Sequence, residues 1–322
     1  MGSDSIMKLV MDLSYENIWR CWQLFRKGKK KSRELTEFIY HQEKYLWWLF
    51  KDLNNCTYKH GGYKKFTVCD NKKREIAVAS ITDRIVHRMV YEYLVPVFDH
   101  EFCYDVWSCR KGKGLHGALE RTQEFMLRYA DCYVWRADVK KFFDSVDQKI
   151  LFEIMERKVR DPGVRNLIQQ IIESYNSGIT GKGIPIGNLT SQIFANIYLN
   201  ELDRFVLHQV KPLAYLRYGD DFVVFVREKM VLEKIRETVV DFLGKKLMLK
   251  IHANGDNIIK SKSGLNFLGC KINVWGRSLN GRNRRRVNIK LNPGNYAGYY
   301  GIIMKNEPMA HRKVWHWLYE LI

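Results

Sequence analysis

The sequence is short of the residues that stabilise small secreted domains. Its seven cysteines are scattered and form no C-x-x-C pair, so we expect neither a disulfide framework nor a zinc site. No apolar run approaches the roughly 20 residues of a membrane span, and the N-terminus lacks the apolar stretch of a signal peptide. These absences predict a protein of the reducing cytoplasm that has no membrane partner.

Acidic residues are also in short supply. The 322 residues include 35 Asp and Glu against 54 Lys and Arg, which gives a formal net charge of +19. Such an excess favours a polyanionic partner, either nucleic acid or an anionic membrane surface, although a merely soluble basic protein would look the same. Because no membrane-spanning run is present, nucleic acid is the better interpretation.

The most informative pattern is Tyr218-Gly-Asp-Asp221, which lies between two apolar runs. Gly219 and Asp220 have turn chemistry, so residues 213–226 predict a β-hairpin with two adjacent carboxylates at its tip. Neighbouring carboxylates repel each other, and their clustering indicates a bound cation. Two-metal phosphoryl transfer requires such clusters to hold Mg²⁺ ions about 3.5–4 Å apart.

A third carboxylate is expected beside this hairpin. Asp138 ends the predicted strand 131–139, and the backbone carbonyl of Val139 is a further possible metal ligand. Asp147 is better explained as the N-terminal carboxylate of a helix, and the role of Asp144 stays open.

Apolar periodicity indicates the order of the elements. The first 55 residues are expected to be helical and basic, with Trp47 and Trp48 in the core. Short strands at 64–68 and 74–78 follow, then helices near 148–159 and 164–175, and further strands near 247–251 and 265–274. This order predicts an α+β fold with helices on one face of an antiparallel sheet.

Over most of residues 60–270, the chain resembles reverse transcriptases of the bacterial group II intron lineage. Motif A of that family corresponds to residues 138–144, motif B to Gly183-Ile-Pro-Ile-Gly-Asn-Leu-Thr-Ser-Gln192, and motif C to residues 218–221. Residues 267–269 resemble the primer-grip turn, residues 73–78 and 83–87 resemble the fingers, and residues 107–114 resemble the basic segment between fingers and palm. The stretch 251–256 lacks the lysine that is common in motif D.

The resemblance implies an RNA-directed DNA polymerase that uses two Mg²⁺ ions, or Mn²⁺, with an RNA template, a primer and deoxynucleoside triphosphates. Asp138, Asp220 and Asp221 would be catalytic and, with Val139, would hold the metal ions. Nucleotide contacts would come from Arg74 at the triphosphate, from Phe143 as a steric gate against a ribose 2′-hydroxyl, and from Ile186, Gly187 and Val139. Template and primer contacts would come from Arg110, Lys111, Phe267, Leu268, Gly269, Arg284 and Arg285.

The same resemblance implies a right-hand polymerase in three parts. Residues 1–130 would form the N-terminal helices and fingers with the first palm helix, residues 131–274 the palm, and residues 275–322 a short helical thumb. A thumb of this length predicts weak intrinsic hold on the duplex. We therefore expect a structured non-coding RNA or an accessory protein as a partner.

Motif B distinguishes branches of the family. Ordinary group II intron enzymes have glutamine where this chain has Ile186, and the change resembles the error-prone enzymes of diversity-generating retroelements. Reverse transcriptases of phage defence sometimes share the signature and are the alternative. An RNA-dependent RNA polymerase fits less well because Phe143 precedes Asp144 in motif A. An inactive RNA-binding scaffold fits poorly because the three predicted catalytic aspartates are intact.

Overall fold

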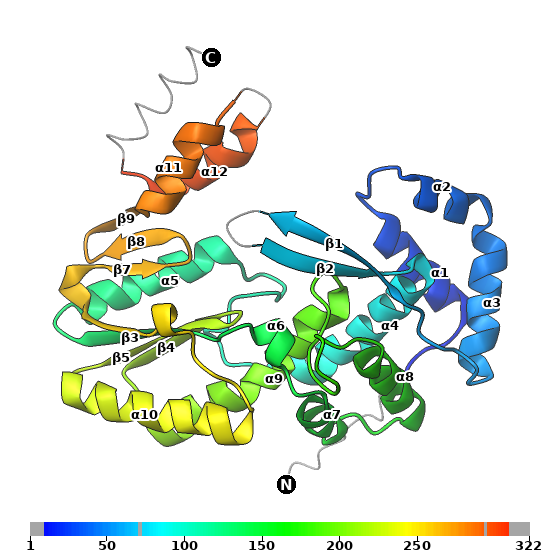
Figure 1. The fold of residues 1–322 in the computed structure, drawn as a ribbon, viewed down its shortest axis with the longest axis horizontal. Coiled ribbons are helices and arrows are strands. Elements are labelled where there is room, and N and C mark those ends of the chain that lie inside the picture. Colours follow the sequence, from blue (N-terminus) through cyan, green and yellow to red (C-terminus); the bar gives the residue numbers. More distant parts are fainter. Residues whose placement is uncertain (1–9, 70–72, 293–294, 309–322) are drawn as a thin grey trace, which may run out of the picture. The chain divides into compact units, whose positions relative to one another are not determined.

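The computed structural model describes residues 10–69, 73–292 and 295–308. The chain divides into two compact units, and the division falls within helix α9 (Figure 1). The first unit comprises residues 1–102, 141–201 and 246–249, and the second comprises residues 103–140, 202–245 and 250–322. The expected division into fingers, palm and thumb at residues 130/131 and 274/275 stays a prediction.

The first unit is mainly helical. Several of its helices begin after a short polar side chain that caps them: Ser14, Ser32 and Ser80 accept bonds from backbone N–H groups of the first turns. Asp147 likewise accepts from Ile150 N, which confirms its predicted helix-capping role. The elements are α1 (Tyr15–Arg26), α2 (Arg33–Tyr40), α3 (Gln42–Asn54), α4 (Ile81–Phe98), η1 (Asp99–Glu101), α6 (Phe142–Ser145), α7 (Gln148–Glu156), α8 (Pro162–Glu173) and α9 (Leu189–Phe205), which continues into the second unit.

The two strands predicted near 64–68 and 74–78 are present in the first unit and pair with each other. Strands β1 (Tyr63–Cys69) and β2 (Lys73–Ala79) form an antiparallel ribbon in which Tyr63 is opposite Ala79. The predicted burial of Trp47 and Trp48 is wrong, because their exposed fractions are 47% and 49%. Both side chains lie on the outer side of α3, where Lys51 and Lys44 approach their rings.

The second unit is built on a four-stranded antiparallel sheet of order β4-β5-β3-β6. Its strands are β3 (Tyr133–Asp138), β4 (Ala214–Tyr218), β5 (Asp221–Val226) and β6 (Asn257–Lys260). The β4–β5 hairpin confirms the prediction for residues 213–226. The predicted strand at 247–251 is wrong: within it only Ile251 forms a bridge, to Val139, and the outer strand is β6 instead.

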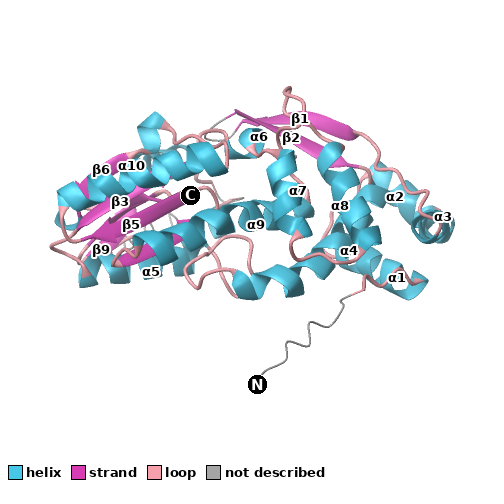
Figure 2. Cartoon of the chain, turned by 90° about the horizontal axis from the view of Figure 1, so that it is seen from below, coloured by secondary structure: helices cyan, strands magenta, loops and turns pink. Residues whose placement is uncertain are grey.

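Alternation along the strands places side chains on both faces of this sheet. Val134, Leu216, Val223 and Phe225 share one face and pack with α5 (Leu115–Arg128) and with the small sheet β7 (Leu265–Phe267), β8 (Cys270–Asn273) and β9 (Gly276–Leu279). Helix α10 (Lys229–Lys246) and the end of α9 lie on the opposite side (Figures 1 and 2). The sheet is therefore covered on both faces, whereas the sequence pattern predicted helices on one.

The remaining described elements extend the second unit. They are η2 (Val206–Val210), η3 (Ala253–Gly255), η4 (Ser261–Ser263), α11 (Gly281–Lys290) and α12 (Tyr296–Asn306). No helix among the described residues is long and apolar enough to cross a membrane. The end of the predicted thumb, including Trp315 and Trp317, lies outside the described residues.

Candidate active site

The predicted catalytic carboxylates lie at one end of the four-stranded sheet. The register of β3 and β5 pairs Asp138 with Asp221, the first residue of β5. A two-residue turn, Gly219 and Asp220, joins β4 to β5, and Gly219 has φ 64°. A positive φ at the first turn position suits a tight hairpin and favours glycine. The sheet register thus places three aspartates of two distant motifs at the same end of the sheet.

Three hydrogen bonds hold the backbone of this turn. Gly219 N donates to Ser108 Oγ at 2.9 Å, and Arg217 Nη1 donates to the Gly219 carbonyl at 3.0 Å. Val139 N donates to the Asp220 carbonyl at 3.1 Å, so motif A is fastened directly to motif C. The position of Asp220 is therefore set by partners from three segments of the second unit.

A buried ion pair fixes the arginine beneath the turn. Arg217 and Asp203, the latter near the end of α9, have side chains 0% and 1% exposed. Arg217 Nε and Nη2 donate to the two oxygens of Asp203 at 2.7 and 2.6 Å, and the Tyr215 hydroxyl adds a bond of 2.7 Å. A bidentate pair of this kind fixes the plane of the guanidinium, which then points Nη1 at the turn.

Asp221 has a partner that the sequence analysis did not identify. Arg136 Nε and Nη2 donate to its two oxygens at 3.0 and 2.7 Å. Arg136 Nη1 also donates to the Asn266 carbonyl in β7 at 2.8 Å. The available signal was strand alternation, because Arg136 and Asp138 are two residues apart on β3 and share a face.

Burial raises the pKa of the Asp221 carboxyl to about 6. Arg136 opposes this rise, whereas the negative charges of Asp138 and Asp220 add to it. This repulsion is the electrostatic environment in which a bound cation is favourable.

Among the described residues, no three His, Cys, Asp or Glu side chains converge as a ready metal site. Arg136 donates to both oxygens of Asp221. Asp138 and Asp220 fit the donor chemistry of a Mg²⁺ site. Recruitment of Asp221 would require it to exchange Arg136 for the metal ion.

The loop 251–256 packs tightly behind Asp138. His252 N donates to the Asp138 carbonyl at 2.8 Å. A Cβ atom on Gly255 would lie 2.6 Å from Asp138 Cβ, closer than real Cβ contacts allow. Asp256 in turn accepts from Trp135 Nε1 at 2.8 Å and pairs with Arg236 of α10. This loop lacks the motif D lysine, and its structural contribution is to support the backbone of Asp138.

Four predicted nucleotide-contact residues, Arg74, Phe143, Ile186 and Gly187, lie in the first unit, where the motif B loop is bonded to strand β2, whereas Val139 lies in the second unit. Ala77 N donates to the Ile186 carbonyl at 3.0 Å, and Asn188 Nδ2 donates to the Ala77 carbonyl at 2.7 Å. Gly187 has φ 116°, and a Cβ atom there would lie 2.8 Å from Ile76 Cγ2. Glycine is therefore required at this position both for its backbone angle and for the close approach of β2.

Phe143 and Arg74 belong to the same unit. Phe143 is half-buried in α6, packs edge-on against Phe142, and accepts a bond from Ile184 N through its carbonyl at 2.8 Å. Arg74 is exposed on β2, opposite Val68. The end of motif A at Phe143, motif B and the β1–β2 ribbon are thus connected within the first unit.

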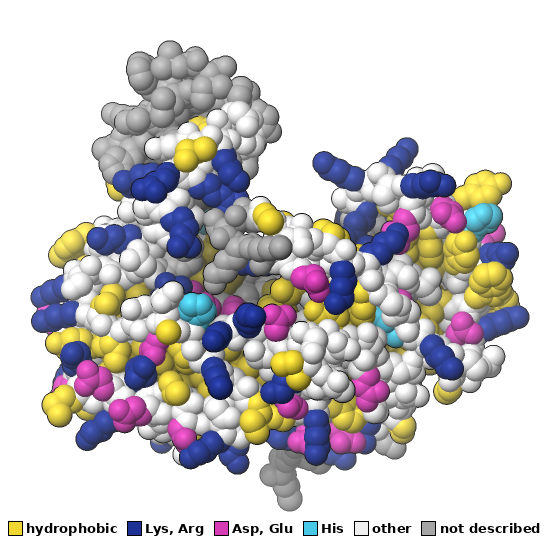
Figure 3. Space-filling view, viewed as in Figure 1, with side chains coloured by type: hydrophobic (Ala, Val, Ile, Leu, Met, Phe, Trp, Pro, Cys, Tyr) yellow, Lys and Arg dark blue, Asp and Glu magenta, His cyan; other side chains and the backbone are white. Residues whose placement is uncertain are grey.

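The predicted template and primer residues occupy different environments. Arg110 Nη1 donates to the Cys103 carbonyl at 2.8 Å and so holds its own loop, whereas Lys111 is exposed. Arg284 pairs with buried Glu307, and Arg285 is exposed on α11. Lys and Arg side chains gather over α11 in Figure 3.

The expected primer-grip turn is the β7–β8 hairpin. Phe267 is 1% exposed, and Leu268 and Gly269 form the turn with φ 48° and 83°. Asn280 N and Asn283 Nδ2 both donate to the Gly269 carbonyl at 3.1 Å. The bond from Arg136 to Asn266 links this hairpin to Asp221.

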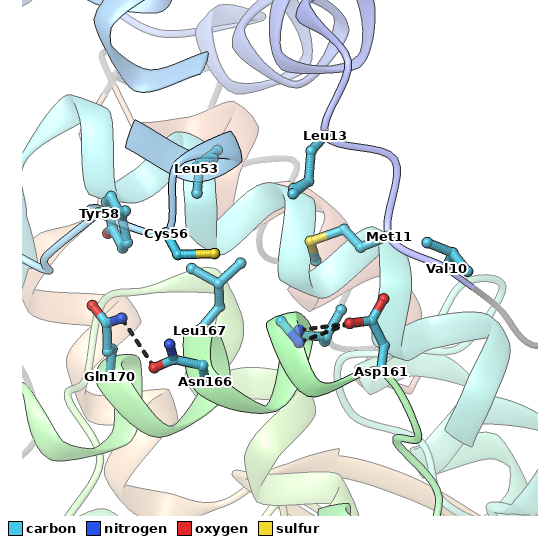
Figure 4. Close-up of a pocket in the computed structure, with 12 residues that line it drawn as sticks. Val10, Met11, Leu13, Leu53, Cys56, Tyr58, Asp161, Asn166, Leu167 and Gln170 are labelled. Carbon is cyan, nitrogen blue, oxygen red and sulfur yellow. Dashed lines mark hydrogen bonds between the residues drawn. The ribbon is translucent and has the colours of Figure 1, made fainter. Parts of the chain in front are cut away.

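A mostly apolar pocket of the first unit lies outside these elements (Figure 4). Val10, Met11, Leu13 and Leu53 line one part of it, and α8 supplies Leu167. Asp161 at its rim already caps α8. The lining includes none of the predicted site residues, and it offers no set of reactive groups.

Comparison with known proteins places this geometry in a family. The family described as "Reverse transcriptase (RNA-dependent DNA polymerase)" matches residues 57–272. Protein YkfC of Escherichia coli is 25% identical over 247 residues, covering 63% of this chain and 64% of YkfC. Group II intron-encoded protein LtrA of Lactococcus lactis is 24% identical over 270 residues, covering 63% of this chain and 45% of LtrA.

The fold has a counterpart among solved structures. Apo telomerase of Candida tropicalis, truncated from its C-terminal domain, superposes with a TM-score of 0.52 at 13% identity. The match covers 75% of this chain and 60% of that one. This chain thus spans less than two thirds of the length of these relatives.

Proposed function

Because the chain belongs to the reverse transcriptase (RNA-dependent DNA polymerase) family, we propose that it synthesises DNA on an RNA template. The observation that carries the proposal is the pairing of Asp138 with Asp221 beside the Gly219–Asp220 turn. This arrangement gathers carboxylates at one sheet end, as metal-assisted nucleotidyl transfer requires.

Asp138 and Asp220 would hold the divalent cations, Mg²⁺ or Mn²⁺, with the Val139 carbonyl as a further ligand. When bound, the two ions stabilise the charge that develops as a primer 3′-hydroxyl attacks the α-phosphorus. The Val139–Asp220 and Ser108–Gly219 bonds keep the carboxylates in fixed positions, which limits reorganisation during the reaction. Asp221 would complete the site after leaving Arg136.

The nucleotide would be bound by residues of the first unit. Arg74 is exposed and suited to triphosphate oxygens, because a guanidinium offers a fork of N–H donors. Phe143 would exclude a ribose 2′-hydroxyl, and Ile186 and Gly187 would lie against the nascent base pair. Lys111, Phe267, Leu268, Gly269 and Arg285 would contact template or primer, as would Arg110 and Arg284 if they released their present partners.

The test is primer extension on an RNA template with Asp138→Asn and Asp220→Asn. Loss of charge at a metal ligand removes several kcal/mol of transition-state stabilisation, so activity should fall by at least about 100-fold. Asp241→Asn is the control, because Asp241 is an exposed aspartate of α10 outside the predicted site. Robust synthesis by either of the first two variants, with the fold intact by circular dichroism, would refute the proposal.

We further propose an error-prone role in a diversity-generating retroelement, with phage defence as the alternative. The residue in question is Ile186, whose backbone bonds to β2 while its side chain can only pack. Ile186→Gln adds a hydrogen-bonding group worth about 0.5–1.5 kcal/mol, enough to change error rates several-fold. Sequencing products from an adenine-rich RNA should show fewer errors opposite adenine in the variant. Equal, low error rates in both enzymes would favour the defence role.

The partners follow from the same reasoning and are equally proposals. A structured non-coding RNA or an accessory protein would supplement the short segment after residue 275. Sequencing of nucleic acid that copurifies with the chain would identify the template and the primer.

A further inference from the structure

A buried histidine joins helix α4 to the first turn of α9. His87 is 0% exposed. Its Nδ1 lies 2.8 Å from Thr190 Oγ1, and its Nε2 lies 2.9 Å from Nε2 of His60. Nδ1 of His60 lies 2.6 Å from the Gly61 carbonyl. Four residues from three segments of the first unit therefore form one hydrogen-bonded chain.

The Gly61 carbonyl, at one end of this series of hydrogen bonds, determines which atom donates and which accepts in each bond. A carbonyl only accepts, so Nδ1 of His60 carries the hydrogen that bonds Gly61. With the hydrogen of the His60 ring on Nδ1 alone, its Nε2 is an acceptor, and His87 donates to it from Nε2. This leaves Nδ1 of His87 to accept from the Thr190 hydroxyl. Burial lowers the pKa of His87 to about 3, with smaller contributions from His60 and Arg84, so this histidine is neutral.

Thr190 lies two residues beyond the part of motif B that is bonded to β2. Asn188 accepts from Ala79 N at 3.3 Å and donates to the Ala77 carbonyl at 2.7 Å. Thr190 is fully buried and fastens the next residues of the same turn to α4. The motif B loop is thus anchored twice, to β2 before the helix begins and to His87 directly after.

We propose that His87 is a positioning residue for nucleotide binding, acting through Thr190 on the loop that carries Ile186 and Gly187. The inference rests on the proposed function, because the proposed function assigns nucleotide contacts to that loop. Without the bond from Thr190 to His87, the first turn of α9 retains its helical hydrogen bonds but loses its side-chain contact with α4. The loop then samples more positions, and the nucleotide is bound less tightly.

Two variants test this role. Thr190→Val removes the hydroxyl and keeps the side-chain shape, and His87→Gln replaces the ring with an amide. Loss of one positioning hydrogen bond should raise the KM for the deoxynucleotide by about 3- to 10-fold while kcat stays within about 2-fold. His100→Gln is the matched control, because His100 is exposed and lies outside the chain of bonds. A merely structural defect would instead lower kcat through the folded fraction.

Two further measurements separate this inference from the polymerase proposal. Nitrogen-15 NMR should show His87 neutral with its hydrogen on Nε2, and Thr190→Val should shift the Nδ1 resonance. Calorimetric titration with a deoxynucleoside triphosphate should show the same 3- to 10-fold loss of affinity even if the chain makes no DNA. Unchanged affinity and KM in folded Thr190→Val would overturn the inference.

Discussion

Arg136 holds both carboxylate oxygens of Asp221, with donor–acceptor distances of 3.0 and 2.7 Å. Their side chains are 26% and 13% exposed, so the pair is largely shielded from water. Removing one partner of such a pair is destabilising, because the remaining charge stays buried without an opposite charge beside it. Asp221, which is predicted to be catalytic, therefore also contributes to the stability of the fold.

Arg136→Gln should lower the free energy of unfolding by about 2–4 kcal/mol, since it leaves Asp221 unpaired. Asp221→Asn alone should also destabilise, and the double variant should lose less than the sum of the two single changes. A double-mutant cycle by urea unfolding measures this coupling. Strictly additive losses would show that the pair contributes nothing, despite its geometry.

Gly255→Ala should impair primer extension by moving Asp138. The added methyl group would lie 2.6 Å from Asp138 Cβ and 3.4 Å from Asp138 N. These atoms belong to or adjoin the backbone, so the clash can be relieved only by moving the backbone of Asp138 or of the loop. Gly244→Ala in α10 is the matched control, because no heavy atom lies within 4 Å of its added Cβ. That control should be neutral or slightly stabilising, by up to about 1 kcal/mol. Equal activity in the two variants would contradict the supporting role of the 251–256 loop.

Phe143→Ala should allow ribonucleotides to be incorporated. The half-buried ring packs against Phe142, which restricts its movement and would keep it against the sugar. Competition between deoxynucleotide and ribonucleotide in primer extension gives the ratio of their kcat/KM values for both proteins. Efficient use of ribonucleotides by the unaltered chain would favour the RNA polymerase alternative.

Neutralising Arg282 and Arg285 should weaken RNA binding in a salt-dependent way. Both are exposed on α11, whereas Arg284 is paired with buried Glu307. Each phosphate contact that is lost should reduce the log–log salt slope by about 0.7–0.9. Lys149→Gln, at an exposed lysine of α7, serves as the control for net charge. Arg284→Gln should mainly reduce stability, and an unchanged slope in the Arg282/Arg285 variant would show that these residues face only solvent.

Acid should destabilise the fold partly through His87. Its folded pKa of about 3 lies below the ordinary histidine value near 6.5, so below that value the unfolded chain binds more protons. The contribution of neutral His87 is complete above about pH 6.5 and is lost as the pH falls toward 3. Between pH 7 and 5, wild type should lose about 1–2 kcal/mol more than His87→Gln in urea unfolding. Parallel pH profiles for the two proteins would exclude this contribution.

Local patterns in the sequence determined much of the fold. Glycine and aspartate between two apolar runs predicted the β4–β5 hairpin, and alternation predicted the strand that ends at Asp138. Both depend on residues adjacent in the chain, whose backbone preferences and periodicity are visible without tertiary information. The helix that begins after Asp147 was predictable for the same reason.

Contacts between distant segments were decided only by the tertiary structure. β6 rather than 247–251 became the outer strand, because pairing with β3 depends on register and not on the short apolar run alone. Strand alternation placed Arg136 on the same face as Asp138, but only the pairing of β3 with β5 showed that Arg136 holds Asp221. The sequence contained no sign that Gly255 would pack on Asp138 or that Thr190 would hydrogen-bond to His87. These relationships arise when strand order and helix packing bring together side chains 85, 117 and 103 residues apart. The sequence by itself determined which carboxylates lie at the sheet end, and the packing determined how each one is held.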